Sequence, residues 1–194
     1  QYTNMSTFTK AENGKNMLTV EGTTDAGRSF SLRMDKETGL LLDYCVDGQV
    51  VLEKGPVPSF WRAQIYNDIP VKYNSALSNE ADTMELSREP VITMDENGKH
   101  IKVALRVSLP VDAEQTITYD IYGNGEIVVD SSFTPKSNFA PGTVGQYALP
   151  KVGMRMTLAA GYENLEYFGR GPEENYIDRN TSTDVGVYKS TVTE

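Results

Sequence analysis

A short alternation of apolar and polar residues, repeated along the chain, constrains the fold most. Phe30, Leu32 and Met34 share one face of their stretch, and the same pattern returns over residues 101–107. A period of two is that of a β-strand with one face on a core, and no stretch carries the i, i+3, i+4, i+7 apolar stripe of a helix. Turns with glycine, such as Asp47-Gly48, separate the stretches. The sequence therefore predicts an all-β, antiparallel β-sandwich.

The predicted strands form one domain over residues 1–194, after an irregular N-terminal lead-in at residues 1–16. Gly55, Pro56, Val57 and Pro58 are expected to interrupt the ladder, because proline donates no hydrogen bond to it. No repeat or linker divides the chain. The expected strands cover residues 16–24, 28–35, 40–47, 49–55, 83–95, 100–110, 114–122, 126–135, 151–160 and 185–192.

Size and charge exclude several classes of function. The chain has 194 residues and a formal net charge of -9, whereas nucleic acids and anionic membranes attract clusters of Lys and Arg. No apolar run of about 18 residues predicts a transmembrane helix. A (β/α)8 barrel, which typically needs about 250 residues, does not fit in this length. Nucleic acid and membrane are therefore not predicted partners.

The residues best suited to acid–base chemistry are few. His100 is the only histidine and follows a turn, so it is interpreted as a solvated hairpin residue rather than a base or a metal ligand. Glu173 and Glu174 are adjacent, and neighbours on an extended backbone point to opposite sides, which does not suit two carboxyls that act together as nucleophile and acid. Cys45 is the only cysteine and is expected to be a small hydrophobe on a strand facing the core. No metal site and no catalytic residue is predicted.

The densest cluster of polar groups follows an aromatic pair near the C-terminal end. Residues 167–179 read YFGRGPEENYIDR, with two glycines around Arg170 and a proline after them. Such a run is expected to take the backbone out of the sheet into a fixed loop. Its polar groups must be either solvated or paired.

This segment resembles the YFGRGPxENYxDR signature of the long, lactose-operon type β-galactosidases of glycoside hydrolase family 2. Residues 58–68, PSFWRAQIYND, are similar to the family's NFWRAPTDND loop. Both motifs belong to the C-terminal, small-chain (domain 5 type) β-sandwich, and the resemblance covers about Gly27 to Tyr188. It implies a supersandwich fold of the galactose mutarotase-like kind. The family's sandwich continues beyond this point, so the chain is expected to be a truncated part of it.

The resemblance implies that the catalytic glutamates lie on a separate (β/α)8 barrel of the parent chain. The parent would hydrolyse terminal β-D-galactosides with retention, and this fragment alone would be inactive. The loop at residues 60–68 would form the rim of the active site. Within it, Gln64, Ile65 and Tyr66 depart from the family pattern. In a purely structural alternative, the tryptophan plugs the sandwich edge and the arginine pairs with a core carboxylate. The candidate substrate-rim residues are Trp61, Arg62, Asn67 and Asp68.

The second motif is interpreted as a structural or interdomain network with Tyr167, Arg170, Glu174, Asn175, Tyr176, Asp178 and Arg179. The expected partners are the barrel and a carbohydrate substrate, within a homo-oligomeric parent. No cofactor is expected in this chain; Mg and Na ions of the parent would bind outside it. Two alternatives remain open: a freestanding carbohydrate-binding or scaffold module, and a family 2 glycosidase with another sugar specificity.

Overall fold

The computed structural model describes residues 5–62, 84–109, 113–136, 151–173, 175 and 180–193. Backbone contacts divide the chain into two compact units, Gln1–Thr157 and Leu158–Glu194, which are described separately. The described residues contain strands and turns but no helix, as predicted for an all-β chain. Accordingly, no helix in the described part of the chain is long and apolar enough to cross a membrane.

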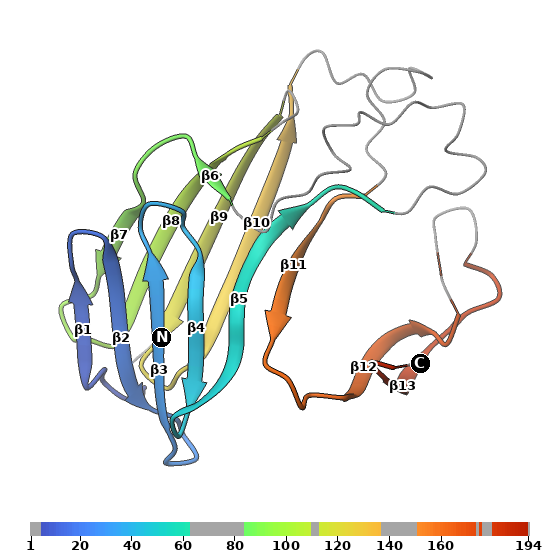
Figure 1. Ribbon diagram of the computed structural model, residues 1–194, viewed down its shortest axis with the longest axis horizontal. Coiled ribbons are helices and arrows are strands. Elements are labelled where there is room, and N and C mark those ends of the chain that lie inside the picture. Colours follow the sequence, from blue (N-terminus) through green and yellow to red (C-terminus); the bar gives the residue numbers. More distant parts are fainter. Residues whose placement is uncertain are drawn as a thin grey trace. The chain divides into compact units, whose positions relative to one another are not determined.

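The first unit consists of two antiparallel sheets (Figure 1). The first sheet has the strand order β1-β2-β3-β4-β5-β11. Its strands are β1 (Lys10–Asn13), β2 (Met17–Thr23), β3 (Ser29–Asp35), β4 (Leu41–Val46), β5 (Gln49–Ser59) and β11 (Gly153–Leu158). In the second sheet, β10-β9-β8-β6 are neighbours and β7 also pairs with β8. These strands are β6 (Glu85–Leu86), β7 (Val91–Met94), β8 (His100–Ser108), β9 (Ala113–Tyr122) and β10 (Ile127–Pro135).

One apolar cluster fills the space between the two sheets. The alternating residues of β3 and of β8 point into it, as their period of two requires. The antiparallel β-sandwich predicted from the sequence is therefore confirmed. The buried cluster consists of Leu18, Val20, Phe30, Leu32, Met34, Leu40, Leu41, Leu52, Val57, Met84, Ile101, Val103, Leu105, Val107, Ile117, Tyr119 and Ile121.

The predicted hairpin turn at Asp47-Gly48 is confirmed by its backbone. Both residues have positive φ, 50° and 76°, as a two-residue type I′ turn requires. Asp47 also accepts hydrogen bonds from the backbone and the hydroxyl of Ser29, 2.9 and 3.2 Å away. The turn therefore joins β4 to β5 and is fastened to β3.

The expected break at Gly55–Pro58 is wrong, because β5 continues without interruption to Ser59. Residues two apart in a strand direct their N–H groups to the same side, so Pro56 and Pro58 remove donors from one side only. The other side stays available for pairing with a neighbour. Gly55 allows β11 to approach closely, since a Cβ there would lie 2.9 Å from the Cα of Met156.

Two further strand predictions need correction. Residues 1–16 are not irregular throughout, since Lys10–Asn13 forms the edge strand β1. Its four residues are mostly exposed and lack apolar alternation, so hydrophobic pattern could not reveal the strand. The single strand expected over residues 83–95 is divided into β6 and β7, with Ser87–Pro90 between them.

Cys45 does not face the core as predicted. It is half-buried and lies opposite Ser31, on the face of β3 that points away from Phe30 and Leu32. Apolar residues are nearly continuous in β4, so alternation does not define which face is buried. The pairing of β4 with β5 also shifts register between Tyr44 and Cys45.

The second unit contains a two-stranded antiparallel hairpin, β12 (Asn164–Gly171) and β13 (Asp184–Thr191). The predicted departure of the backbone from the sheet at the two glycines is wrong. Gly169 lies opposite Gly186, and Gly171 lies opposite Asp184, so the ladder runs through both glycines. The prediction that residues 1–194 form a single domain stays a prediction.

Candidate functional site

The family-like loop begins at Phe60, directly after β5. Phe60 is only 4% exposed, and its ring centroid lies 5.6 Å from that of Phe133 on β10. The two rings are tilted by 50°, an arrangement that aromatic pairs favour. The contact of Phe60 with Phe133 fixes the point at which the loop leaves the first sheet, because Phe133 belongs to the second sheet.

Trp61 and Arg62 follow this anchor and are both half-buried. Asn67 and Asp68, the other two candidate rim residues, lie outside the described residues, as do Gln64, Ile65 and Tyr66. Half-burial fits both a rim contact and a purely structural role. The substrate-rim assignment therefore stays a prediction.

In the second motif, the glycines make room for two tyrosine rings. The centroids of Tyr167 and Tyr188 are 5.5 Å apart across the β12–β13 ladder. A Cβ on Gly171 would lie 2.5 Å from the Tyr167 hydroxyl and 2.9 Å from the Tyr188 ring. The Tyr188 hydroxyl donates to the carbonyl of Asp184 at 2.9 Å, which holds that ring along its strand. Gly171 is thus required by the tyrosines that cover it, whereas a Cβ on Gly169 would meet only an ordinary contact, 3.7 Å from the Tyr167 ring.

Arg170 connects the hairpin to the loop that joins its strands. Its Nη1 donates to the carbonyls of Thr183 at 2.8 Å and Asn180 at 3.3 Å. Thr183 is buried, and its hydroxyl donates to the carbonyl of Asn180 at 3.0 Å. Arg170, itself exposed, therefore holds residues 180–183, which lead into β13, and the network predicted for the whole motif stays a prediction.

Most of the other predicted members of this network cannot be placed. Asn175 is exposed. The remaining members, Glu174, Tyr176, Asp178 and Arg179, lie outside the described residues. Their structural or interdomain role stays a prediction.

His100 is not the solvated residue that its position after a turn suggested. Its Nε2 lies 2.7 Å from Oδ1 of Asp120, and its ring stacks on Tyr122 at 5.1 Å. Its side chain is 17% exposed. The pairing of β8 with β9 explains these contacts, since His100 lies opposite Tyr122. Asp120 is two residues before Tyr122 and therefore on the same face of the sheet. One histidine held by one carboxylate on a strand favours a structural role.

The carboxyl of Asp47 has a pKa below its ordinary value. The hydrogen bond from Arg28 Nε, at 2.7 Å, lowers this pKa, and the backbone bond from Ser29 acts in the same direction. A general acid for glycoside hydrolysis needs a raised pKa. The shift of Asp47 is opposite to the one that such an acid requires.

Metal ligands are also not gathered in the part of the chain that the structure describes. Within it, no group of three or more His, Cys, Asp or Glu side chains is arranged to hold a metal ion. The expectation that Mg and Na ions bind elsewhere in the parent stays a prediction.

Two antiparallel sheets around one apolar cluster define the first unit as a β-sandwich domain. The sequence model of the beta galactosidase small chain matches residues 26–194. The chain therefore belongs to the β-galactosidase small-chain family, as the resemblance of the motifs predicted.

Known relatives support this assignment and show how much of them the chain represents. The chain is 28% identical over 178 residues to the beta-galactosidase of Priestia megaterium, covering 91% of this chain. It is 28% identical over 176 residues to that of Halalkalibacterium halodurans, covering 86%. With the beta-galactosidase of Lactobacillus delbrueckii subsp. bulgaricus it shares 27% over 168 residues, also covering 86%. The chain spans 16% of the length of each of these relatives.

Proposed function

We propose that this chain is a non-catalytic part of the C-terminal sandwich of a retaining β-galactosidase, and that it shapes the rim of an active site on a separate barrel domain. The observation that carries the proposal is the family match over residues 26–194, combined with a length that is 16% of its relatives. The parent would hydrolyse terminal β-D-galactosides.

The anchoring of the loop supports a role at the rim. Because Phe60 is buried against Phe133, the position of the following Trp61 is tied to the sandwich rather than to a free loop. An aromatic ring offers an apolar platform to a sugar face, and Arg62 offers several hydrogen-bond donors. A rigid support of this kind holds contact residues in place.

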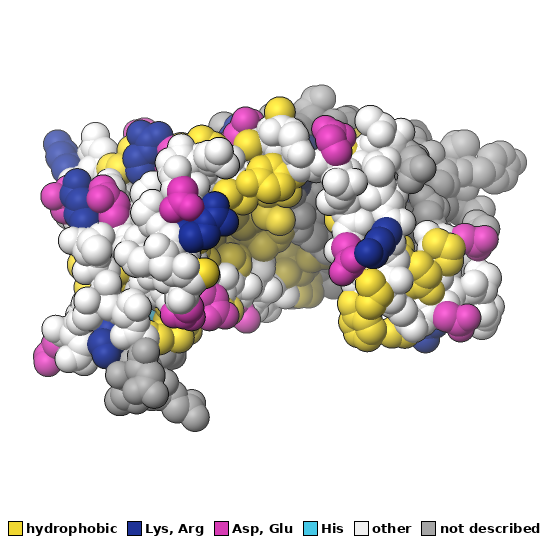
Figure 2. All heavy atoms as spheres, turned by 90° about the horizontal axis from the view of Figure 1, so that it is seen from below, with side chains coloured by type: hydrophobic (Ala, Val, Ile, Leu, Met, Phe, Trp, Pro, Cys, Tyr) yellow, Lys and Arg dark blue, Asp and Glu magenta, His cyan; other side chains and the backbone are white. Residues whose placement is uncertain are grey.

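The hairpin supports membership in a larger polypeptide. Phe168 and Val187 lie opposite each other, and Val185 shares their face. Their exposed fractions are 77%, 61% and 59%, so this apolar face is open to solvent. Apolar side chains also gather at the surface in the space-filling view of Figure 2. An isolated two-stranded hairpin is marginally stable at best in water, and exposed apolar patches mark interaction surfaces. The barrel is the partner surface proposed for the parent.

The parent protein tests the proposal through its activity. We expect it to release nitrophenol from nitrophenyl β-galactoside, and we expect the 194-residue chain alone to release none. Absence of β-galactosidase activity in the parent, or turnover by the isolated chain, would refute the proposal.

The rim role needs its own comparison. Trp61→Ala in the parent should reduce kcat/KM for β-galactosides by about tenfold, the effect of losing roughly 1.4 kcal/mol of binding to the transition state. Val50→Ala is the control, because Val50 is exposed and lies at the other end of β5. Equal kinetics in the two variants would exclude a role for Trp61 at the rim.

A further inference from the structure

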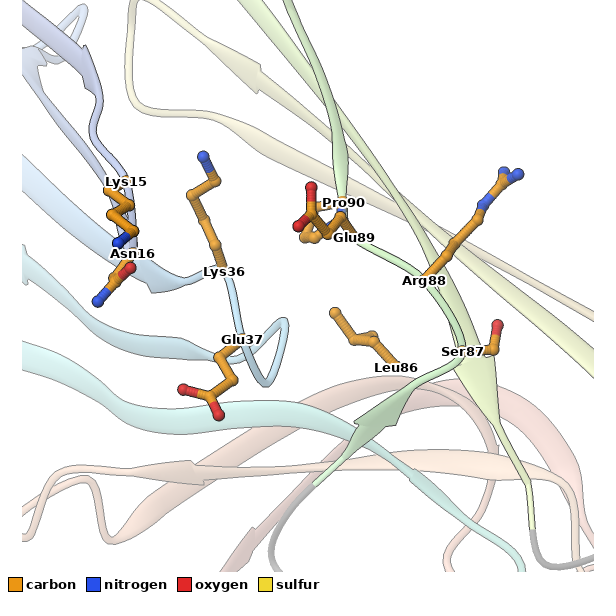
Figure 3. A pocket seen from close by; sticks show the side chains of 9 residues that line it. All are labelled: Lys15, Asn16, Lys36, Glu37, Leu86, Ser87, Arg88, Glu89 and Pro90. Carbon is orange, nitrogen blue, oxygen red and sulfur yellow. The ribbon is translucent and has the colours of Figure 1, made fainter.

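A groove opens at one end of the first unit, where turns from both sheets meet. It has a volume of about 450 Å³, which lies within the range of small-molecule sites. One wall carries Lys15 and Asn16 from the β1–β2 turn, with Lys36 and Glu37 from the turn after β3. The other wall consists of Leu86, the last residue of β6, and the connection from Ser87 to Pro90 that leads to β7 (Figure 3).

The first wall is held in shape by hydrogen bonds. The backbone N–H of Lys36 donates to the carbonyl of Asn16 at 2.9 Å. Its Nζ donates to Oδ1 of Asn13 and to the carbonyl of Gly14, both at 2.9 Å. An ammonium group has three donors, so Lys36 keeps one for a ligand while the other two fix its position.

The second wall is fastened to the neighbouring strand β8. The backbone N–H and the hydroxyl of Ser87 donate to the carbonyl of Arg106, at 2.9 and 3.1 Å. Leu86 is half-buried and packs against the core, and Pro90 restricts the backbone where β7 begins. The groove is therefore preformed on both sides.

Its free polar groups are of mixed type. The side chains of Lys15, Glu37, Arg88 and Glu89 form no hydrogen bond or ion pair with another described residue. Figure 3 shows Leu86, Glu89 and Pro90 facing the first wall, while Arg88 extends away from it. The groove thus presents ammonium donors and carboxylate acceptors beside an apolar surface.

We propose that this groove binds a neutral, hydroxyl-rich ligand of the size of a mono- or disaccharide. Each sugar hydroxyl is both a donor and an acceptor, so it is matched by lysine and glutamate side chains together. The apolar face of a sugar ring, which carries its C–H groups, can pack on Leu86 and Pro90. Charges of both signs line the groove, the cations Lys15, Lys36 and Arg88 and the carboxylates of Glu37 and Glu89, which suits a neutral ligand that both donates and accepts. The inference does not depend on the proposed function, because the groove is built without any residue of either family-like motif.

Saturation-transfer NMR on the intact protein tests this site, with cellobiose and maltose as probes because neither carries a terminal galactose. We expect saturable binding whose dissociation constant rises by about tenfold in the Glu37→Ala/Glu89→Ala variant, through loss of charge-assisted hydrogen bonds. Glu53→Ala is the matched control, since Glu53 is an exposed glutamate on β5 outside the groove. It should bind as the wild type does.

Two other results would overturn the inference. The first is the absence of saturable binding, or binding that the double variant leaves unchanged while circular dichroism shows both variants folded. The second is displacement of the sugar by inorganic phosphate at equal concentration, which would identify an anion site. Activity on β-galactosides, measured on the same samples, reports separately on the proposed function.

Discussion

Gly171 lies directly beneath the tyrosine pair of the hairpin, 2.5 Å from the Tyr167 hydroxyl when measured from an added Cβ. The Tyr188 ring lies 2.9 Å from the same point and is held by its bond to Asp184. Gly169 lies two residues earlier on the same face of β12. A Cβ added there would lie 3.7 Å from its nearest neighbour, Cδ2 of Tyr167. The two glycines of the motif therefore differ in what they allow.

Gly171→Ala should destabilise the hairpin by about 1–3 kcal/mol, since the added methyl group forces the tyrosine rings to move. Amide hydrogen exchange over residues 164–171 and 184–191 measures this local loss of stability. Gly169→Ala is the control and should leave exchange nearly unchanged, because its methyl group meets only ordinary contacts. Equal exchange in the two variants would contradict the steric explanation.

Phe60→Ala should destabilise the sandwich by about 3–5 kcal/mol, the usual result of truncating a buried aromatic residue. Urea unfolding followed by the fluorescence of Trp61, the only tryptophan of the chain, measures the change. Phe168→Ala removes the same ring from a residue that is 77% exposed and should have little effect. A small loss in the Phe60 variant would show that the loop is not anchored there.

Tyr44 and Tyr119 are expected to respond in opposite ways to loss of their hydroxyl groups. The Tyr44 hydroxyl donates to the carbonyl of Gly125 at 3.0 Å, so Tyr44→Phe should cost about 1 kcal/mol. The Tyr119 hydroxyl is buried without a hydrogen-bond partner among the described residues, and this burial raises the pKa of Tyr119. Tyr119→Phe should therefore be neutral or stabilise the fold by up to about 1 kcal/mol.

Chemical denaturation of both tyrosine variants at neutral pH, where the hydroxyls are protonated, gives the two free energies of unfolding. A loss in the Tyr119 variant as large as in the Tyr44 variant would mean that a water molecule satisfies the buried hydroxyl.

Asp47 should contribute to stability in a pH-dependent way. Arg28 lowers the pKa of the folded carboxyl below its ordinary value of 3.8, so the unfolded chain binds the proton more readily. The contribution is present above the unfolded pKa and is lost as the pH falls through the folded pKa. Asp47→Asn keeps a residue that tolerates positive φ and should remove this dependence.

Unfolding curves between pH 6 and pH 2, a range of roughly two units on each side of the ordinary carboxyl pKa, measure this dependence. The stability difference between wild type and Asp47→Asn should shrink as the pH falls below the ordinary value. Asp130→Asn, at an exposed aspartate of β10 without an ion pair among the described residues, is the control. A difference that stays constant over this range would contradict the assignment.

The sandwich could be predicted from the sequence because its core strands alternate regularly between apolar and polar residues. Phe30, Leu32 and Met34 alternate without interruption on β3, and the buried residues of β8 do the same in the other sheet. The Asp47-Gly48 turn could be predicted for the same reason, since its positive φ values demand a particular pair of residues. Local patterns of this kind need no knowledge of distant contacts.

The errors arose where a distant contact decides the local structure. Proline and glycine were interpreted as breaks at Pro56 and Gly171, yet their neighbouring strands accept both residues within a ladder. The environment of His100 depends on Asp120 and Tyr122, twenty or more residues away. In the candidate site, the family motifs identified Trp61 and Arg62 as loop residues, while the buried anchor Phe60 needed the structure.

Among the described residues, the hydrogen bonds of Arg170 to the segment before β13 go to backbone carbonyls, those of Asn180 and Thr183. Every amino acid supplies the same carbonyl group. The hydrogen bond from Arg170 to position 180 therefore does not depend on which side chain stands there. Substitutions of the side chain at position 180 that leave the backbone in place should therefore keep this contact, provided that the arginine is retained.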